Sequence, residues 1–337
     1  MNEDDNFKSH SVTAAAPSST ANLGPGFDIF GLAIDAFEDY VSVSHDHRSS
    51  LSSENSNTVH GTSSQIQIEM TGPHHKSIPL EAGRNSAGLA VQKIIREFDI
   101  KGSFYVVVEK NVPPGFGMGS SAASAAAAVM AMDALLDLRI PKSDLVRFAA
   151  EGEKASAGSL HFDNVAASLL GGFVLVRSFS TIPEFIQITP PRNLHLVFAI
   201  PDLIVPAKKT EVARKVLPEK VLLGDVVHNL SNASTVVAGF LLKDVDMIAS
   251  GMEDIIVEPA RKHLIPCFDT IRTNAVAAGA LAITISGAGP SVVAIASRED
   301  RLEMIEDSMR DGFRRCNLSC STLKCSPSLG ARIVSRG

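Results

Sequence analysis

One glycine-rich segment constrains this chain more than any other feature. Residues 112–122 read Val-Pro-Pro-Gly-Phe-Gly-Met-Gly-Ser-Ser-Ala and connect a run of β-branched residues to an alanine-rich stretch. Closely spaced glycines let a backbone approach a phosphate, and the N-terminus of a helix offers unpaired N–H groups and partial positive charge. We therefore expect a phosphate cradle between a strand and a helix, with Ser120 and Ser121 in the first helical turn.

This segment differs from two common phosphate loops. No Lys follows the last glycine, as it would in a Walker loop, and the wider glycine spacing of a dinucleotide fold is missing. The alternative that the segment alone leaves open is a glycine-rich turn capped by Ser.

Composition and charge limit the classes of protein. The 337 residues, 45% of them hydrophobic and 20% charged, suit a globular chain of about two domains. A net charge of −6 provides no diffuse basic surface, so we expect neither a nucleic acid nor a membrane as partner. The acidic start lacks the layout of a secretion signal, and the apolar run 122–136 is too short to span a bilayer, so we expect a cytoplasmic protein.

Hydrophobic periodicity and turn residues predict a coarse order of elements. We predict a polar exposed loop at 44–64 and a second lobe that begins near residue 191, which divides the chain into 1–190 and 191–337. Strands are expected at 39–44, 65–70, 103–108, 194–200, 281–286 and 291–296, and helices at 86–97, 119–138, 142–157, 163–170, 226–250, 263–278 and 298–312.

The four cysteines lie late in the chain, at positions 267, 316, 320 and 325. The spacing of the last three invites a metal site, but no fourth ligand follows at zinc-site spacing. We expect reduced thiols that bind no metal.

Two further segments carry a family resemblance. Residues 17–31, residues 285–291 and the central glycine-rich segment resemble, in order, the three motifs of the superfamily of galactokinase, homoserine kinase, mevalonate kinase and phosphomevalonate kinase, and they bracket nearly the whole chain. The resemblance implies an α+β fold, with an amino-terminal lobe similar to the second domain of ribosomal protein S5 and a carboxy-terminal ferredoxin-like lobe. It also implies that ATP binds between the lobes, at Asn85, Pro113, Pro114, Gly115, Phe116, Gly117, Met118, Gly119, Ser120, Ser121 and Ala122.

Within that superfamily the chain is most similar to the homoserine kinase branch. The similar segments are 21–28, 152–153 with 161–164, 209–214 and 258–261. Met118 stands where the family usually has Leu, a change of similar volume. The resemblance implies transfer of the γ-phosphoryl group of ATP to the side-chain hydroxyl of L-homoserine in threonine biosynthesis, and a homodimer.

The substrate brings a carboxylate and an ammonium, so its site needs cations and anions. We assign the carboxylate to Arg214 and Arg261, whose guanidinium groups can bond it in a forked geometry. The alternative is that these residues form surface pairs with Glu211 and Glu258. The ammonium is assigned to Asp28, with Asn22 shaping the loop, and family similarity adds His161 and Asp163 as polar walls. Asp163 is also a candidate helix cap.

Magnesium is assigned to Glu153 and the Ser121 hydroxyl, because this hard cation prefers oxygen ligands and bridges phosphates. The alternative for Glu153 is a solvated helix carboxylate near Lys154. Asn85 resembles an adenine contact of the family, but it would equally serve as a helix cap.

The reacting centre is assigned to Asp163, Asn164 and Thr210. Sister kinases are thought to use an aspartate near this point as a base, and two alignments place either Asp163 or Asn164 there. We favour Asn164 facing the transferred phosphoryl group and Asp163 facing the ammonium, which would leave the enzyme without a dedicated base. The alternative functions are a mevalonate-kinase-like enzyme and an ATP-binding sensor without catalysis.

Overall fold

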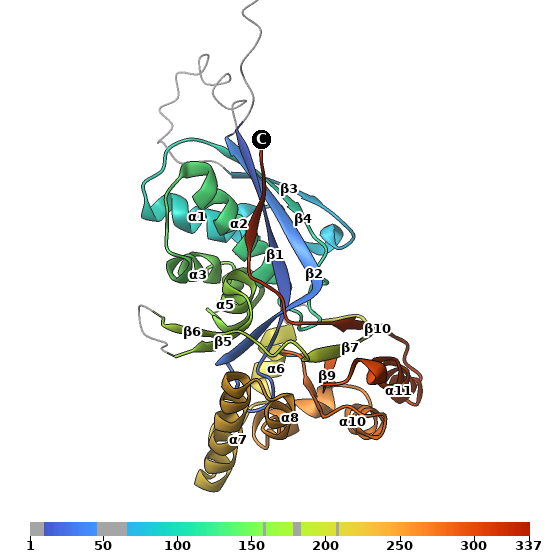
Figure 1. Cartoon of the computed structure of the whole chain (residues 1–337). Coiled ribbons are helices and arrows are strands. Elements are labelled where there is room, and N and C mark those ends of the chain that lie inside the picture. Colours follow the sequence, from blue (N-terminus) through green and yellow to red (C-terminus); the bar gives the residue numbers. More distant parts are fainter. Residues whose placement is uncertain (1–9, 46–65, 158–159, 178–182, 207–208) are drawn as a thin grey trace, which may run out of the picture.

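The computed structural model describes residues 10–45, 66–157, 160–177, 183–206 and 209–337. Two β-sheets organise them, one in each lobe, and helices pack on both (Figure 1). The α+β class and the two lobes expected from the sequence are therefore confirmed. Most of the predicted loop at 44–64 lies outside the described residues, although Ser44 belongs to a strand.

The larger sheet has seven strands in the order β11-β1-β2-β4-β3, with β5 beside β2 and β6 beside β5. Strands β3 and β4 run parallel, and the other neighbours are antiparallel. The strand bounds are β1 (Ser11–Ala21), β2 (Phe30–His45), β3 (Ile66–Thr71), β4 (Phe104–Glu109), β5 (Phe173–Val176), β6 (Phe185–Ile188) and β11 (Arg332–Arg336).

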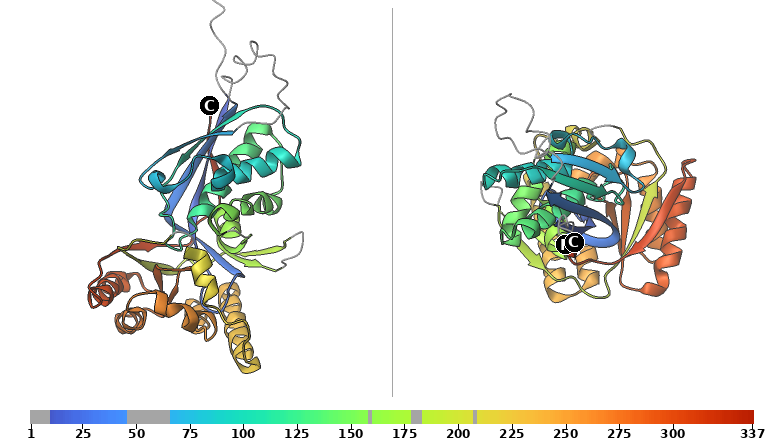
Figure 2. Two further views of the ribbon diagram at one scale, coloured as in Figure 1. Left: turned by 180° about the vertical axis from the view of Figure 1, so that it is seen from behind. Right: turned by 90° about the horizontal axis from the view of Figure 1, so that it is seen from above.

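Helices cover one face of this sheet, as the views from both sides show (Figures 1 and 2). The central helix α2 is buried along most of its length because its alanines allow close packing against β1 and α1. The helices of this lobe are α1 (Ser86–Glu97), α2 (Ser120–Leu136), α3 (Lys142–Ala150), α4 (Glu153–Ala157) and α5 (Asp163–Leu170), with short 3₁₀ turns at His75–Ser77 and Ala82–Arg84.

The smaller sheet is antiparallel in the order β10-β7-β9-β8, with strands β7 (His195–Pro201), β8 (Ala282–Ile285), β9 (Val292–Ala296) and β10 (Cys320–Cys325). The helices α10 (Phe268–Ala277) and α11 (Leu302–Arg314) pack on one face around an aliphatic core. The remaining helices are α6 (Lys209–Lys215), α7 (Leu223–Leu242), α8 (Val245–Ser250) and α9 (Val257–Arg261), with 3₁₀ turns at Lys262–Leu264 and Glu299–Arg301.

A third apolar core joins the two sheets. The ring of Phe173 in β5 stacks on Phe240 of α7 with centroids 3.8 Å apart, and the first residues of β2 pack in the same cluster as Phe198 of β7. After β10 of the smaller sheet, the chain returns to the larger sheet, where the last strand, β11, pairs with β1. The division of the chain into 1–190 and 191–337 stays a proposal. Residues Arg332–Arg336 of the second part belong to the larger sheet.

Three predicted helices are interrupted. The helix expected at 263–278 is a 3₁₀ turn at Lys262–Leu264 followed by α10 from Phe268. The helix expected at 142–157 is divided at Glu151 and Gly152 into α3 and α4. Gly152 allows close packing here, because a Cβ on it would be 2.7 Å from the Ser86 carbonyl oxygen. The helix expected at 226–250 ends at Leu242, where Lys243 takes a positive φ and Asp244 caps α8 through a 2.9 Å bond from Met247 N–H.

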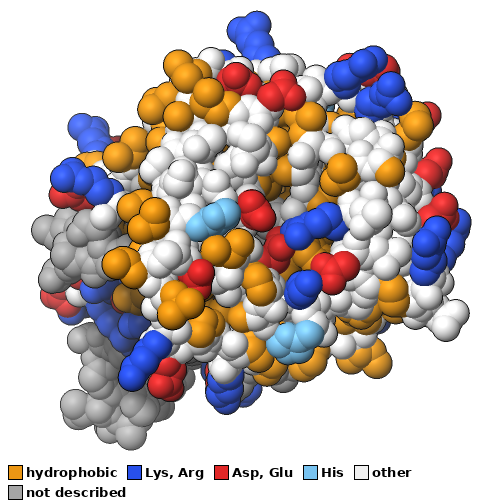
Figure 3. All heavy atoms as spheres, turned by 90° about the horizontal axis from the view of Figure 1, so that it is seen from below, with side chains coloured by type: hydrophobic (Ala, Val, Ile, Leu, Met, Phe, Trp, Pro, Cys, Tyr) orange, Lys and Arg blue, Asp and Glu red, His pale blue; other side chains and the backbone are white. Residues whose placement is uncertain are grey.

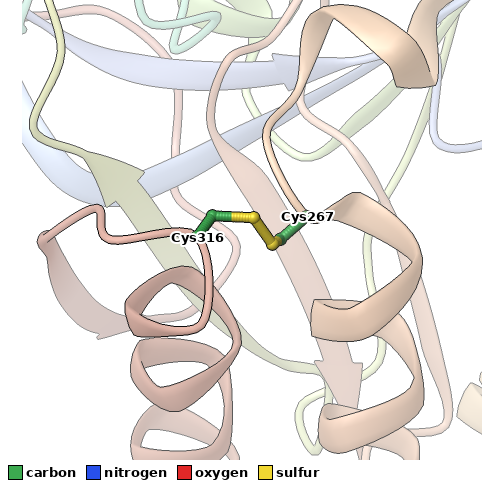
Figure 4. Close-up of a disulfide and its surroundings, with 2 residues drawn as sticks. All are labelled: Cys267 and Cys316. Carbon is green, nitrogen blue, oxygen red and sulfur yellow. A yellow bond between two sulfur atoms is a disulfide. The ribbon is translucent and has the colours of Figure 1, made fainter.

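The prediction that all four cysteines are reduced was wrong for two of them. Cys267, just before α10, and Cys316, just after α11, form a disulfide with Cα atoms 6.1 Å apart (Figure 4). They are 49 residues apart in sequence, and only the antiparallel packing of the two helices brings them together. Cys320 and Cys325 are free thiols.

The surface of the smaller lobe is mixed in charge. Seen from below, acidic and basic side chains are interspersed with apolar ones (Figure 3). Among the described helices, none combines the length and the apolar character needed to cross a bilayer.

Candidate active site

A cavity of about 550 Å³ lies where the three glycine-containing segments meet. The glycine-rich loop forms one wall, and the residues between α4 and α5 form another. Side chains from the β1–β2 turn, α6 and α9 close the far end. The fold therefore gathers into one hollow the residues that the sequence spreads between positions 22 and 288.

The glycine-rich loop has the backbone that its sequence predicts. Gly115, Gly117 and Gly119 all have positive φ, and Gly119 immediately precedes α2. A Cβ at Gly117 would lie 2.1 Å from the Ser286 carbonyl oxygen, so the segment 285–291 can pack here only against glycine. The Ser286 hydroxyl donates to the Gly117 carbonyl at 2.7 Å. The cradle is thus held open at the N-terminus of a buried helix, where it favours an anion.

The two serines after the loop have different roles. The Ser120 hydroxyl donates to the Val112 carbonyl at 2.8 Å and stabilises the loop itself. The Ser121 hydroxyl instead donates to Glu153 Oε1 at 2.6 Å. Of the two predicted hydroxyls, only that of Ser121 is placed beside a carboxylate that lines the cavity.

Glu153 is a buried carboxylate, not a solvated one. Its side chain lines the cavity, and Lys154 pairs with Glu151 instead, at 2.6 Å. Burial raises the pKa of Glu153 to about 7, and the nearby Asp163 adds to the rise, while the Ser121 hydrogen bond opposes it. A carboxylate in this environment is stabilised by a cation.

Beneath the cradle lies an ion pair that sequence reasoning missed. Lys110, at the end of β4, is buried and pairs with the buried Asp39 of β2, and it donates to the Ser120 carbonyl at 2.6 Å and the Ser124 hydroxyl at 2.8 Å. Asp39 also accepts from the N–H groups of Asn111 and Val112, each at 2.9 Å. The pair therefore ties the strand before the loop to the helix after it. No local pattern signals it, because the partners are 71 residues apart.

At the other end of the cavity, Arg214 of α6 reaches across to the β1–β2 turn. One of its terminal nitrogens donates to both oxygens of Asp28, at 2.6 and 2.7 Å, and lies 2.9 Å from His161 Nδ1. The surface pair with Glu211 is not observed, because Glu211 pairs with Lys215. The predicted residues Asp28, His161 and Arg214 thus form one cluster.

Arg261, in α9, is more deeply placed and is only 4% exposed. Its Nε donates to the Ala213 carbonyl at 2.9 Å and one terminal nitrogen to the Gly287 carbonyl at 3.3 Å. Burial and the nearby Arg214 lower its pKa to about 10. Glu258, the alternative partner, pairs with Arg272.

Two residues of the first segment shape this end of the site. The ring of Phe27, which the sequence analysis did not single out, lies 5.1 Å from the Arg214 guanidinium and 4.9 Å from that of Arg261, so it separates and orients them. Asn22 donates to the Gly287 carbonyl at 2.8 Å and accepts from the Asp28 N–H at 3.2 Å. Its predicted role in shaping the loop agrees with these bonds.

Asp163 and Asn164 lie between the two ends. Asn164 Oδ1 accepts from the Ser19 hydroxyl at 3.0 Å and would be 3.2 Å from a Cβ placed on Gly119, so this amide is beside the cradle. Asp163 is buried, and its Oδ1 accepts from the Asn164 N–H at 2.8 Å. Burial, and then the negative charge of Asp28, raise the pKa of Asp163 to about 6.

The helix-cap alternatives have opposite outcomes. Asp163 is the first residue of α5 and does not cap it, so that alternative was wrong. Asn85 does cap α1, since its Oδ1 accepts from Ala87 and Gly88 N–H at 3.0 and 3.2 Å, while its Nδ2 donates to Pro79. Asn85 also lines the cavity.

Most other predicted site residues face the cavity. Thr210 lines it, as do Pro114, Gly115, Gly117, Met118, Gly119 and Ser120 of the loop, whereas Pro113, Phe116 and Ala122 do not appear among the lining residues. Lys209, which was noted only as part of a motif, also lines it.

Comparisons with known proteins agree with the family resemblance. The GHMP kinases N terminal domain matches residues 85–172, and the GHMP kinases C terminal domain matches residues 236–315. The chain is 36% identical to a homoserine kinase of Thermoplasma acidophilum, over 95% of this chain and 96% of that protein. It is 38% identical to one of Saccharolobus solfataricus, over 96% of this chain and 98% of that protein.

Solved structures agree as well. A crystal structure of homoserine kinase from Cytophaga hutchinsonii superposes with a TM-score of 0.86 at 32% identity, covering 99% of this chain and all of that one (100%). Mevalonate kinase of L. major, at 16% identity and a TM-score of 0.64 over 96% of this chain and 97% of that one, shares the fold. The chain therefore belongs to the homoserine kinase family of the GHMP kinases.

Proposed function

We propose that this protein transfers the γ-phosphoryl group of ATP to the side-chain hydroxyl of L-homoserine, yielding O-phospho-L-homoserine for threonine biosynthesis. One observation carries the proposal: a single cavity has a phosphate cradle with Ser121 and Glu153 at one end and a cluster of carboxylates and guanidinium groups at the other. An amino acid hydroxyl bound at the charged end would point toward a nucleotide bound in the cradle.

Recognition of homoserine would exchange charges within the cluster. Arg214 pairs with Asp28 in this structure, and both side chains are about one-third exposed at 31%. A bound amino acid would offer its carboxylate to Arg214 and Arg261 and its ammonium to Asp28 and Asp163, so that each charge keeps a partner. His161, whose pKa is lowered by burial and by Arg214, would stay neutral and position Arg214.

The donor set at Ser121 and Glu153 fits magnesium. A hydroxyl and a carboxylate are oxygen ligands, and Mg²⁺ commonly binds one or two protein groups together with the phosphates of its substrate. The raised pKa of Glu153 reflects a buried charge that a cation would stabilise. When bound, the metal would neutralise charge on the phosphate oxygens.

The reacting centre needs no dedicated base in this proposal. Asn164 lies beside Gly119, so its amide would contact the transferred phosphoryl group, and an amide cannot accept a proton at neutral pH. Thr210 of α6, which also lines the cavity, would contact the transferred phosphoryl group. Phosphoryl transfer depends mainly on positioning and charge stabilisation, and the hydroxyl proton would leave late to phosphate or water.

The deciding experiment is an ADP-release assay with homoserine, mevalonate, galactose, serine and threonine as acceptors. We expect homoserine to give a much larger kcat/KM than any other. Mevalonate has a carboxylate but no ammonium, so it would leave Asp28 and Asp163 without a cationic partner. ATP binding without turnover of any acceptor would instead support a sensor, and Ser121 with Glu153 argues against that reading.

A homodimer and a cytoplasmic location are proposals as well. Helix α7 and the residues before it expose large apolar side chains that a second copy would cover, namely Leu222, Leu223, Val227 and Leu230, each 59–78% exposed. Light scattering after gel filtration would measure the mass. The Cys267–Cys316 disulfide bears on the proposed location. Disulfides are rare in the reducing cytosol, except in hyperthermophiles.

A further inference from the structure

The glycine-rich loop contains no lysine, yet one lysine ammonium lies against it from the other side of the cavity. Lys209 Nζ, in the first turn of α6, donates to the Gly115 carbonyl oxygen at 3.2 Å. Just before it in the chain, Val205 lies so close to Gly115 that a Cβ on that glycine would be 2.8 Å from Val205 Cγ1. Val205 and Lys209 therefore both pack against the loop at Gly115.

The charge of Lys209 is poorly compensated. Within the described part of the chain its ammonium makes this one hydrogen bond and no ion pair. Burial, and then repulsion by the nearby Arg261, lower the pKa of Lys209 to about 7. Lys209 is partly buried. An ammonium with reduced access to water and no counter-ion is destabilised, so a ligand that brings negative charge to the site would stabilise it.

We infer that Lys209 is a phosphate-binding residue, which contacts the β- or γ-phosphate of the nucleotide from α6 and supplies the cation that the loop itself lacks. Lysine serves phosphate as a point charge with rotatable donors. The Gly115 carbonyl holds the ammonium over the loop until nucleotide arrives. The inference rests on the proposed function only in taking a nucleotide as the ligand of the cradle.

Binding of ATP and AMP without acceptor, measured by calorimetry, tests this inference separately from homoserine turnover. We expect Lys209→Met to weaken ATP at least about tenfold, the effect of losing one charge-assisted hydrogen bond, and to change AMP by less than about twofold, because AMP lacks the contacted phosphates. Lys209→Arg, which keeps the charge, should recover most of the ATP affinity.

The matched control is Lys215→Met on the same helix, where the ammonium pairs with Glu211 at 2.7 Å and is 71% exposed. It should leave both affinities unchanged. Circular dichroism checks that each variant is folded. The inference is wrong if Lys209→Met binds ATP like the wild type, or if ATP and AMP weaken equally, since the residue would then only support the loop. It is also wrong if the variant raises KM for homoserine alone, because the amino acid carboxylate would then be its partner.

Discussion

Replacing Asp163 by Asn separates the two roles that this buried carboxylate could have. Asn keeps the size of the side chain and an oxygen that can still accept from the Asn164 N–H. The replacement removes only the negative charge and the capacity to take a proton. If Asp163 binds the substrate ammonium, KM should rise and kcat should change little; if it is a base, kcat should collapse.

The two roles predict effects of different size on KM and on kcat. Loss of one charge-assisted contact costs about 1.5–3 kcal/mol, which is roughly a 10- to 150-fold rise in KM for homoserine. Removing a general base would cost roughly 10² to 10⁴ in kcat. We expect the first result, because Asn164, and not Asp163, contacts the Ser19 hydroxyl beside Gly119.

The pH dependence provides an independent measure. The pKa of Asp163 is raised from 3.8 to about 6, so the free enzyme holds a carboxylate there only above about pH 6. In the wild type kcat/KM for homoserine should fall as pH falls through about 6, and Asp163→Asn should lack this contribution.

The same shift predicts a gain in stability. A raised pKa in the folded state means that the protonated form stabilises the fold below pH 3.8 and that this contribution is lost as pH rises through 6. The loss amounts to about 3 kcal/mol for this buried group. Asp163→Asn should therefore unfold at a higher denaturant concentration than the wild type at pH 7, with the difference vanishing near pH 3.5.

In the kinetic test, a kcat that falls about a thousandfold at unchanged KM would refute the assignment of Asp163 to the substrate ammonium.

Three further predictions concern other parts of the molecule. Ser121→Ala and Glu153→Gln should each lower kcat by about a hundredfold or more while homoserine affinity, measured by calorimetry, stays within about twofold; equal losses in both quantities would contradict a metal-binding role. Arg261→Lys should weaken homoserine by about 2 kcal/mol, since a buried forked contact cannot be replaced by an ammonium; an unchanged KM would remove this residue from the substrate site. Reduction of the Cys267–Cys316 disulfide, or Cys316→Ser, should lower the free energy of unfolding by about 4 kcal/mol, as expected for a loop of this length, and denaturant titrations with and without reductant would give the same midpoint if the bond does not form.

Much of the site could be predicted from the sequence because its chemistry is local. The glycines between Gly115 and Gly119 allow the positive φ angles that the loop adopts and predict an anion cradle before a helix. Elements with a distinctive local composition, such as the β-branched run of β4 and the alanine-rich α2, were predicted for the same reason. The family motifs then assigned Asp28, Arg214 and Arg261 to one site, and in the structure these three residues line one cavity.

What remained undecided depends on contacts between residues far apart in the chain. No local pattern shows that Lys110 pairs with Asp39, that Arg214 takes Asp28 and not Glu211 as its partner, or that Lys209 lies over the glycine loop. The strand β11 and the disulfide were missed for the same reason, since each needs a partner brought by packing. The free energy of such pairs is set by burial and by the charges that surround them, and both exist only once the chain has folded.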